Sequence, residues 1–79
     1  MNRDDIRNYI RDSLVDITDD ESIALTDDTT PDAVPGWDSV NHIKLMFAIE
    51  ERFGISFEIS QLTMPTSTGA LIDLIQSAV

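Results

Sequence analysis

The chain has 79 residues, no cysteine and a formal net charge of −10, and 42% of its residues are hydrophobic. This length predicts one small domain, residues 1–79, with a core just large enough to fold. The missing cysteines exclude disulfides, thiolate metal sites and a thioester on the polypeptide itself. Fifteen acidic side chains against five basic ones make nucleic acid and anionic lipid poor partners.

The first residues do not have the pattern of a secretory signal. They lack a basic start followed by an apolar core. No apolar run along the chain approaches the roughly 18 residues of a membrane span. We therefore expect a soluble, monomeric, cytoplasmic protein that does not bind membranes.

A first helix is predicted at the N-terminus. Asn2 can cap it, and Asp4 and Asp5 in its first turn complement the helix dipole. Apolar residues follow at helical spacing and predict the buried face: Ile6, Ile10, Leu14 and Ile17, with Tyr9 beside them.

Residues 18–37 predict a long loop, because the segment is acidic and contains Pro31 and Pro35. Four apolar residues are expected to attach it to the core: Ile23, Leu25, Val34 and Trp37. Structureless connections of this length are often functional in compact domains. This loop ends two residues before Ser39.

Three further helices are predicted after the loop. The second begins near Ser39 and ends at Gly54, a residue that suits the C′ position of a helix. Residues 57–62 allow only a short third helix, which Pro65 closes, and Ser67 caps a last helix. The predicted fold is all-α: a small antiparallel four-helix bundle with a long loop between the first two helices and a short third helix.

Ser39 is the most informative residue of the sequence. It follows Asp38 at the start of the second helix and presents a lone hydroxyl there. The free N–H groups and the positive dipole end of a helix favour an attached or bound phosphate by about 0.3–1 kcal/mol. Ser and Asp are also common helix-start residues, so this position alone does not identify a site.

The residues around and after Ser39 resemble the acyl carrier proteins. That family has a Gly-x-Asp-Ser-Leu site followed by a helix that ends in Leu-Glu-Glu-x-Phe-Gly. The residues of this chain that match the pattern are Gly36, Asp38, Ser39 and Val40, and then Ile49, Glu50, Glu51, Phe53 and Gly54. Chain length, acidity and the long loop agree with the resemblance over nearly the whole sequence.

The resemblance implies that Ser39 carries 4′-phosphopantetheine, with Asp38 beside it in the cofactor-binding motif. The thiol of this arm would hold an acyl group as a thioester. The implied partners are a phosphopantetheinyl transferase and acyl-loading and acyl-processing enzymes. The chain itself would be a carrier and not an enzyme, with no catalytic residue and no metal site.

A helical projection divides the second helix into two apolar faces. Leu45, Met46, Ile49 and Phe53 gather on one face and are predicted to enter the core. Val40, Ile43 and Phe47 gather on the opposite face, next to Ser39. We expect this second face to bind partner enzymes, together with Lys44, Glu50 and Glu51. The alternative is that Ile43 and Phe47 cover the long loop.

The charge of this helix differs from the family pattern. Asn41 and Lys44 stand where fatty-acid-synthase carriers commonly have acids, and residues 39–79 have a net charge of only −2. A dedicated carrier in polyketide, hybrid or glycan-modifying biosynthesis is therefore favoured over one in general fatty-acid synthesis.

Other interpretations of the sequence remain. An aminoacyl or peptidyl carrier of non-ribosomal peptide synthesis would share the serine and the bundle, and a small helical interaction module would lack the prosthetic group. Ser39 and His42 lie three residues apart, but no nucleophile elbow or oxyanion hole supports a hydrolase. The acidic segment 16–27 follows a calcium-loop spacing, yet Glu21 replaces its glycine and Asp27 its final glutamate.

Overall fold

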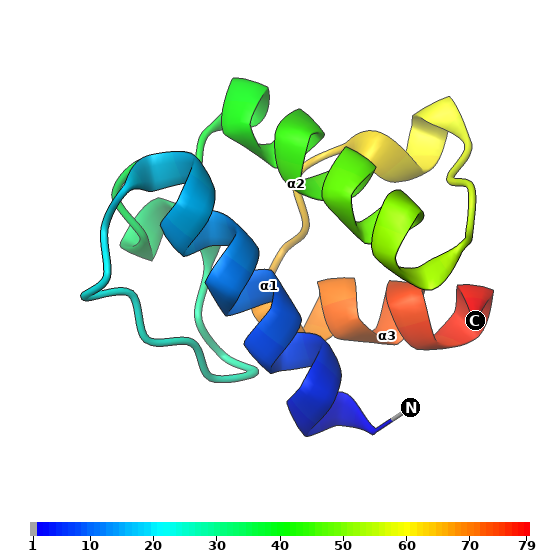
Figure 1. Ribbon diagram of the computed structural model, residues 1–79, viewed down its shortest axis with the longest axis horizontal. Coiled ribbons are helices and arrows are strands. Elements are labelled where there is room, and N and C mark those ends of the chain that lie inside the picture. The colour runs from blue at the N-terminus through cyan, green and yellow to red at the C-terminus, as the bar shows by residue number, and fades with distance from the viewer. Residues whose placement is uncertain (1) are drawn as a thin grey trace.

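The computed structural model describes residues 2–79, which form three α-helices and two 3₁₀ helices. The α-helices are α1 (Arg3–Thr18), α2 (Ser39–Phe53) and α3 (Thr68–Ala78), and the 3₁₀ helices are η1 (Pro31–Ala33) and η2 (Ile59–Leu62). α1 packs against both α2 and α3 (Figure 1). No strand occurs within residues 2–79, so the all-helical prediction is confirmed for this part of the chain.

The structure does not confirm the four-helix bundle. The predicted short third helix is only the four-residue 3₁₀ helix η2, with no buried residue. Its Ile59 is 87% exposed and its Leu62 is only partly buried against the core, so η2 buries too little apolar area to stabilise further turns. A reciprocal capping box between Glu58 and Gln61 holds this single turn instead.

The predicted helix ends are confirmed. The Asn2 side chain accepts a hydrogen bond from the Asp5 backbone N–H at 2.8 Å and caps α1. Ser67 accepts one from the Ala70 N–H at 3.1 Å and caps α3. Gly54 ends α2 with a φ of 66°, a left-handed conformation that glycine adopts without strain.

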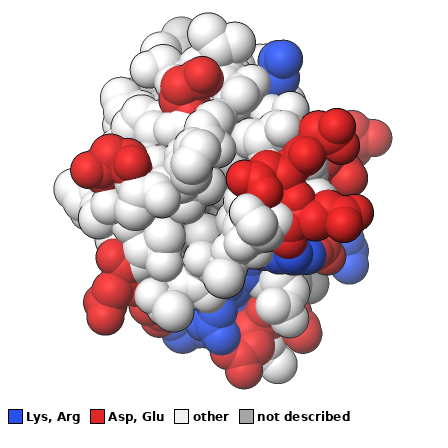
Figure 2. All heavy atoms as spheres, turned by 90° about the vertical axis from the view of Figure 1, so that its left-hand side faces the viewer, with Lys and Arg blue, Asp and Glu red and all other residues white. Residues whose placement is uncertain are grey.

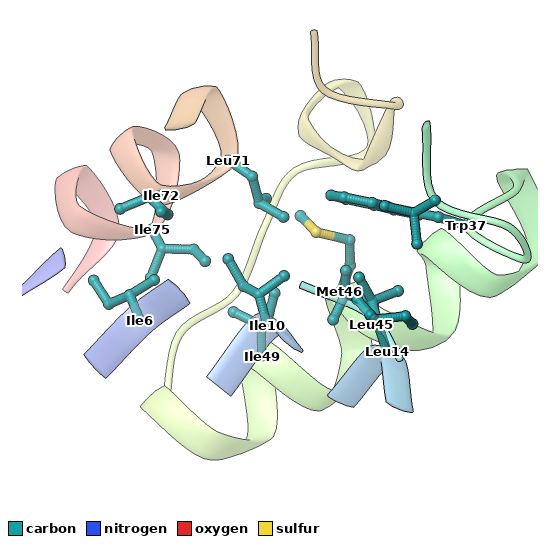
Figure 3. Packing of buried hydrophobic residues seen from close by; sticks show 12 residues of the cluster. Ile6, Ile10, Leu14, Trp37, Leu45, Met46, Ile49, Leu71, Ile72 and Ile75 are labelled. Atoms are coloured by element: carbon teal, nitrogen blue, oxygen red, sulfur yellow. The ribbon is translucent and has the colours of Figure 1, made fainter. Parts of the chain in front are cut away.

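The core lies between the three α-helices and contains the predicted apolar faces (Figure 3). Its members are Ile6, Ile10 and Leu14 from α1, Leu45, Met46 and Ile49 from α2, Leu71, Ile72 and Ile75 from α3, and Ile23, Val34 and Trp37 from the loop. Tyr9, Ile17, Phe53 and Leu74 pack against it partly buried. Figure 3 places Trp37 beside Met46, where the loop enters α2.

The long loop between α1 and α2 is attached at both apolar and polar points. Three of its predicted anchors are buried and the fourth, Leu25, is partly buried. Asp27 pairs with Arg7 at 2.9 Å and with Arg3 at 3.0 Å, both on α1. Its backbone carbonyl also accepts a hydrogen bond from Gly69 N at 2.8 Å, at the start of α3. The loop therefore has a defined path to Ser39.

Candidate functional site

Ser39 is the first residue of α2, and its side chain is exposed. The helix is capped by Asp38, whose carboxylate accepts a hydrogen bond from Asn41 N at 2.9 Å. Among residues 2–79, no hydrogen bond involves the Ser39 hydroxyl. Because Asp38 performs the capping, this hydroxyl is left free at the helix N-terminus.

The turn before Ser39 depends on Gly36, which has a φ of +87°. A Cβ at this position would lie 2.8 Å from Cγ2 of Thr18. The Asn41 side chain donates a hydrogen bond to the Gly36 carbonyl at 2.7 Å and so ties the turn to α2. Gly36 thus serves two requirements, a left-handed backbone and a close approach to the end of α1.

Trp37 and His42 form a buried hydrogen bond beneath this turn. The indole Nε1–H donates to His42 Nδ1 at 3.0 Å, and the two residues are 3% and 1% exposed. Burial lowers the pKa of His42, and the backbone of Thr63 raises it to a smaller extent. Trp37 was predicted as a loop anchor, but nothing in the sequence indicated its bond to His42.

The predicted partner-binding face of α2 is largely exposed. Val40 is 68% exposed and Phe47 57% exposed, and Lys44 and Glu51 are exposed. Ile43, to one side of Val40 and Phe47 in the helical projection, is half-buried. On the opposite face of α2, Leu45, Met46 and Ile49 are buried in the core and Phe53 packs against it partly buried. The predicted separation of the two faces is therefore confirmed, while binding to a partner stays a prediction.

Glu50 and Ile59 differ from their predicted roles. Glu50 was expected to contact partner enzymes, and Ile59 to lie in a short third helix. Glu50 is half-buried, and its carboxylate accepts a hydrogen bond from the Phe57 N–H at 2.7 Å, so it orders the chain after α2. Ile59, which sequence reasoning placed inside a short helix, is the most exposed large apolar side chain of the described residues. No sequence signal marked that exposure, because the predicted segment 57–62 is too short to show a helical period.

The calcium-loop residues have other partners within the protein. Asp27 binds two arginines, and Asp20 accepts a hydrogen bond from Ser22 N at 2.9 Å. No group of three or more potential metal ligands occurs in residues 2–79. The Ser39–His42 pair also lacks the geometry of a nucleophile and its base, because His42 is buried and its Nδ1 is occupied by Trp37.

A shallow hollow of about 270 Å³ lies at the other end of α2. Its lining residues are Asp5, Asn8, Tyr9, Asp12, Arg52 and Phe53. The Arg52 guanidinium carbon lies 5.8 Å from the ring centre of Tyr9 and 5.6 Å from that of Phe53, within cation–π distance of both. The aromatic part of this lining is therefore in contact with a cation of the chain itself.

Comparisons of the chain with protein-family models, curated proteins and solved structures found no match. None of the helices in residues 2–79 combines the length and the apolar character that crossing a membrane requires. The function of the site is therefore inferred from its residues and their geometry.

Proposed function

We propose that the protein is an acyl carrier protein and that Ser39 carries a 4′-phosphopantetheine arm. The observation that supports this most is the position of the Ser39 hydroxyl, which is exposed, free of internal hydrogen bonds and located at the start of α2. The arm is identified as phosphopantetheine from the resemblance of residues 36–54 to the acyl-carrier pattern. The protein would hold its cargo as a thioester and leave the chemistry to other enzymes.

The attachment step needs only the hydroxyl from this chain. A phosphopantetheinyl transferase would remove the Ser39 proton and direct Oγ to the phosphorus of coenzyme A that bears the pantetheine. A new P–O bond forms, the pyrophosphate bond breaks, and 3′,5′-ADP leaves with the electron pair. The resulting phosphodiester lies at the positive end of α2, where the helix dipole favours its charge.

The exposed face of α2 supports a role in docking to partner enzymes. Val40 and Phe47 offer apolar area within about 2.2 turns of Ser39. Lys44 and Glu51 border this area with opposite charges. A central apolar contact with a charged rim is the usual composition of a transient protein interface. We assign this face to the transferase and to the acyl-loading and acyl-processing enzymes.

The charges near Ser39 favour a specialised biosynthetic pathway over general fatty-acid synthesis. Lys44 is exposed, and the Asn41 side chain is bound to Gly36, so neither residue offers the acidic contact that fatty-acid-synthase enzymes use in the family. Polyketide, hybrid or glycan-modifying biosynthesis are the pathways proposed for it. An acidic protein with a locally less acidic docking face would discriminate between these sets of partners.

The proposal is tested by incubating the purified chain with coenzyme A and a broad-specificity phosphopantetheinyl transferase. Intact mass spectrometry should show one added phosphopantetheine on the wild type and on Ser60→Ala, a control at another exposed serine. Ser39→Ala should stay unmodified and folded, because Asp38 keeps the helix cap. An unmodified wild type, or a modified Ser39→Ala, would overturn the assignment, and the former would favour an interaction module.

A further inference from the structure

The protein contains one histidine and one tryptophan, and they are bonded to each other in the core. Trp37 Nε1–H donates to His42 Nδ1 at 3.0 Å, and the ring centres are 6.2 Å apart. Trp37 stands two residues before Ser39 in the chain, and His42 stands three residues after it. The bond therefore joins the end of the long loop to the first turn of α2.

This hydrogen bond specifies the protonation state of His42. Because Nδ1 accepts a hydrogen bond, the single proton of the neutral ring must reside on Nε2. The Nε2 atom is buried and has no hydrogen-bond partner of ordinary geometry among residues 2–79. A second proton would convert Nδ1 into a donor that faces the donor of Trp37. The protonated ring cannot keep this bond.

The surroundings of His42 do not compensate a positive charge. From the loop the ring meets the Trp37 indole, and from the segment after η2 it meets the Thr63 backbone, neither of which ionises. Among the described residues, no ionised side chain influences its pKa, which burial lowers. Asp38 and Lys44, the charged residues nearest to it along the chain, have exposed side chains.

Loss of the bond would act first on the segment that leads to Ser39. Its remaining polar attachments are all to residues close in sequence. Val34 N donates to Pro31 O and Trp37 N to Val34 O. At the start of α2, Asn41 binds the Gly36 carbonyl and the Asp38 carboxylate, and His42 N donates to Asp38 O. The rest of the fold has its own core contacts and ion pairs. A released imidazole would be hydrated and would take up its proton near the ordinary pKa of 6.5.

We propose that the Trp37–His42 hydrogen bond is a pH-sensitive switch: protonation of His42 breaks it and releases residues 34–38, the segment that positions Ser39. The switch goes beyond the proposed carrier function and does not depend on it, because it requires no group on Ser39. In a carrier, the released segment would alter how Ser39 is presented to the transferase.

The switch is tested on the unmodified chain by NMR, with hydrogen exchange measured from about pH 8 to about pH 5. The single histidine and the single indole N–H are each unambiguous signals. The equilibrium constant for opening residues 34–38 should rise by up to about tenfold for each pH unit below 6.5, because only the open state binds the proton. Amides in the middle of α1 and α3 should keep their protection.

His42→Asn supplies the matched control, because its side-chain oxygen can accept the indole hydrogen bond and does not titrate. Opening of residues 34–38 in this variant should not change over the same range. The proposal would be overturned if the wild type keeps indole and segment protection on acidification, if α1 and α3 open together with the segment, or if His42→Asn opens in the same way. The wild-type titration decides the question even if the variant does not fold.

Discussion

At the scale of single residues, Ser39 is free because its neighbours perform the structural tasks. Asp38 caps α2, Asn41 secures the Gly36 carbonyl, and Trp37 anchors the turn in the core. A serine that also capped the helix would lose that bond on modification. This division of tasks would let Ser39 carry the proposed arm without disturbing the start of α2.

Gly36 should be the residue of this turn that tolerates substitution least. Gly36→Ala adds strain at a φ of +87° and a contact of 2.8 Å with Thr18, whose rotamer is held by a hydrogen bond from its hydroxyl to Leu14 O. We expect a loss of about 2–3 kcal/mol in the free energy of unfolding. Gly54→Ala is the control, because its Cβ would meet nothing within 4 Å and only its φ of +66° is strained.

Chemical denaturation of both variants measures the difference. Gly54→Ala should lose about 1 kcal/mol, the strain of one left-handed residue. If Gly36→Ala is no less stable than Gly54→Ala, the close approach of the turn to Thr18 does not constrain the site.

Sequence reasoning identified the single residues whose roles follow from local chemistry. Asn2, Ser67 and Gly54 were predicted at helix ends because capping depends on residues within one turn. The Trp37–His42 bond was not predicted, because it depends on how two side chains pack within the core. Local patterns contain no information on that packing.

At the scale of elements, α2 combines a buried face and an exposed apolar face in fifteen residues. The helical period predicted both faces. Successive residues are rotated by 100° about the helix axis, so the apolar residues of α2 cannot all point into one core. The period did not predict η2, since a segment of six residues has too few turns to show one. Ile59 lies in this short segment, whose single turn buries none of its residues.

Phe47→Ala and Leu45→Ala should separate the two faces of α2. Phe47 is 57% exposed, so its truncation should change the free energy of unfolding by no more than about 0.5 kcal/mol. Leu45 is fully buried, and its truncation should cost about 2–5 kcal/mol. Denaturation of both variants checks this, and Phe47→Ala should also slow modification by the transferase. A loss of about 3 kcal/mol for Phe47→Ala would place this residue in the core.

The attachment of the long loop to α1 should depend on pH through Asp27. Hydrogen bonds from Arg3 and Arg7 lower the pKa of this carboxyl below its ordinary 3.8, the bond from Arg3 being the largest cause. Between the lowered pKa and 3.8 the unfolded chain binds more protons than the folded one, so this stabilisation is present above pH 3.8 and is lost as the pH falls.

Asp27→Asn removes the titrating group and provides the measurement. Denaturation of both proteins between about pH 5 and about pH 3 should show a shallower decline for the variant, because its loop attachment no longer responds to acid. Parallel declines would mean that the arginine pairs of Asp27 do not stabilise the loop.

At the scale of the whole molecule, the negative charge is distributed unequally along the chain. Ten of the fifteen acidic residues lie between Asp4 and Asp32, whereas residues 39–79 have a net charge of −2. Figure 2 shows acidic groups around a broad uncharged area on the side of the long loop. The overall charge of −10 therefore does not describe the surface next to Ser39.

Lys44→Glu tests whether this local charge selects partners. The change should raise the association rate with a basic-faced fatty-acid-synthase acyltransferase, because a rim charge acts mainly on encounter. The gain should shrink as salt rises toward about 1 M, where the Debye length is about 3 Å. Arg52→Glu makes the same charge change at the other end of α2 and should have a smaller effect. Equal rates for Lys44→Glu and the wild type at low salt would leave Lys44 without a role in selection.

The sequence predicted an all-helical architecture but not the number of α-helices, which is three and not four. Apolar spacing located α1, α2 and α3 and their buried faces, and the apolar residues of the acidic loop predicted its anchors Ile23, Val34 and Trp37. The ion pairs of Asp27 with α1 and its backbone contact with Gly69 join segments that are far apart in sequence. Such contacts follow from the folded arrangement, which sequence periodicity does not provide.

The most direct measurement of the carrier assignment is peptide-level mass spectrometry of the protein isolated from the cells that produce it. The peptide containing Ser39 should carry phosphopantetheine, and a fraction of it should carry an acyl thioester that hydroxylamine releases. Fragment ions should place the whole increment on Ser39. If Ser39 is unmodified in the isolated protein and also resists a transferase with coenzyme A, the protein is not a carrier.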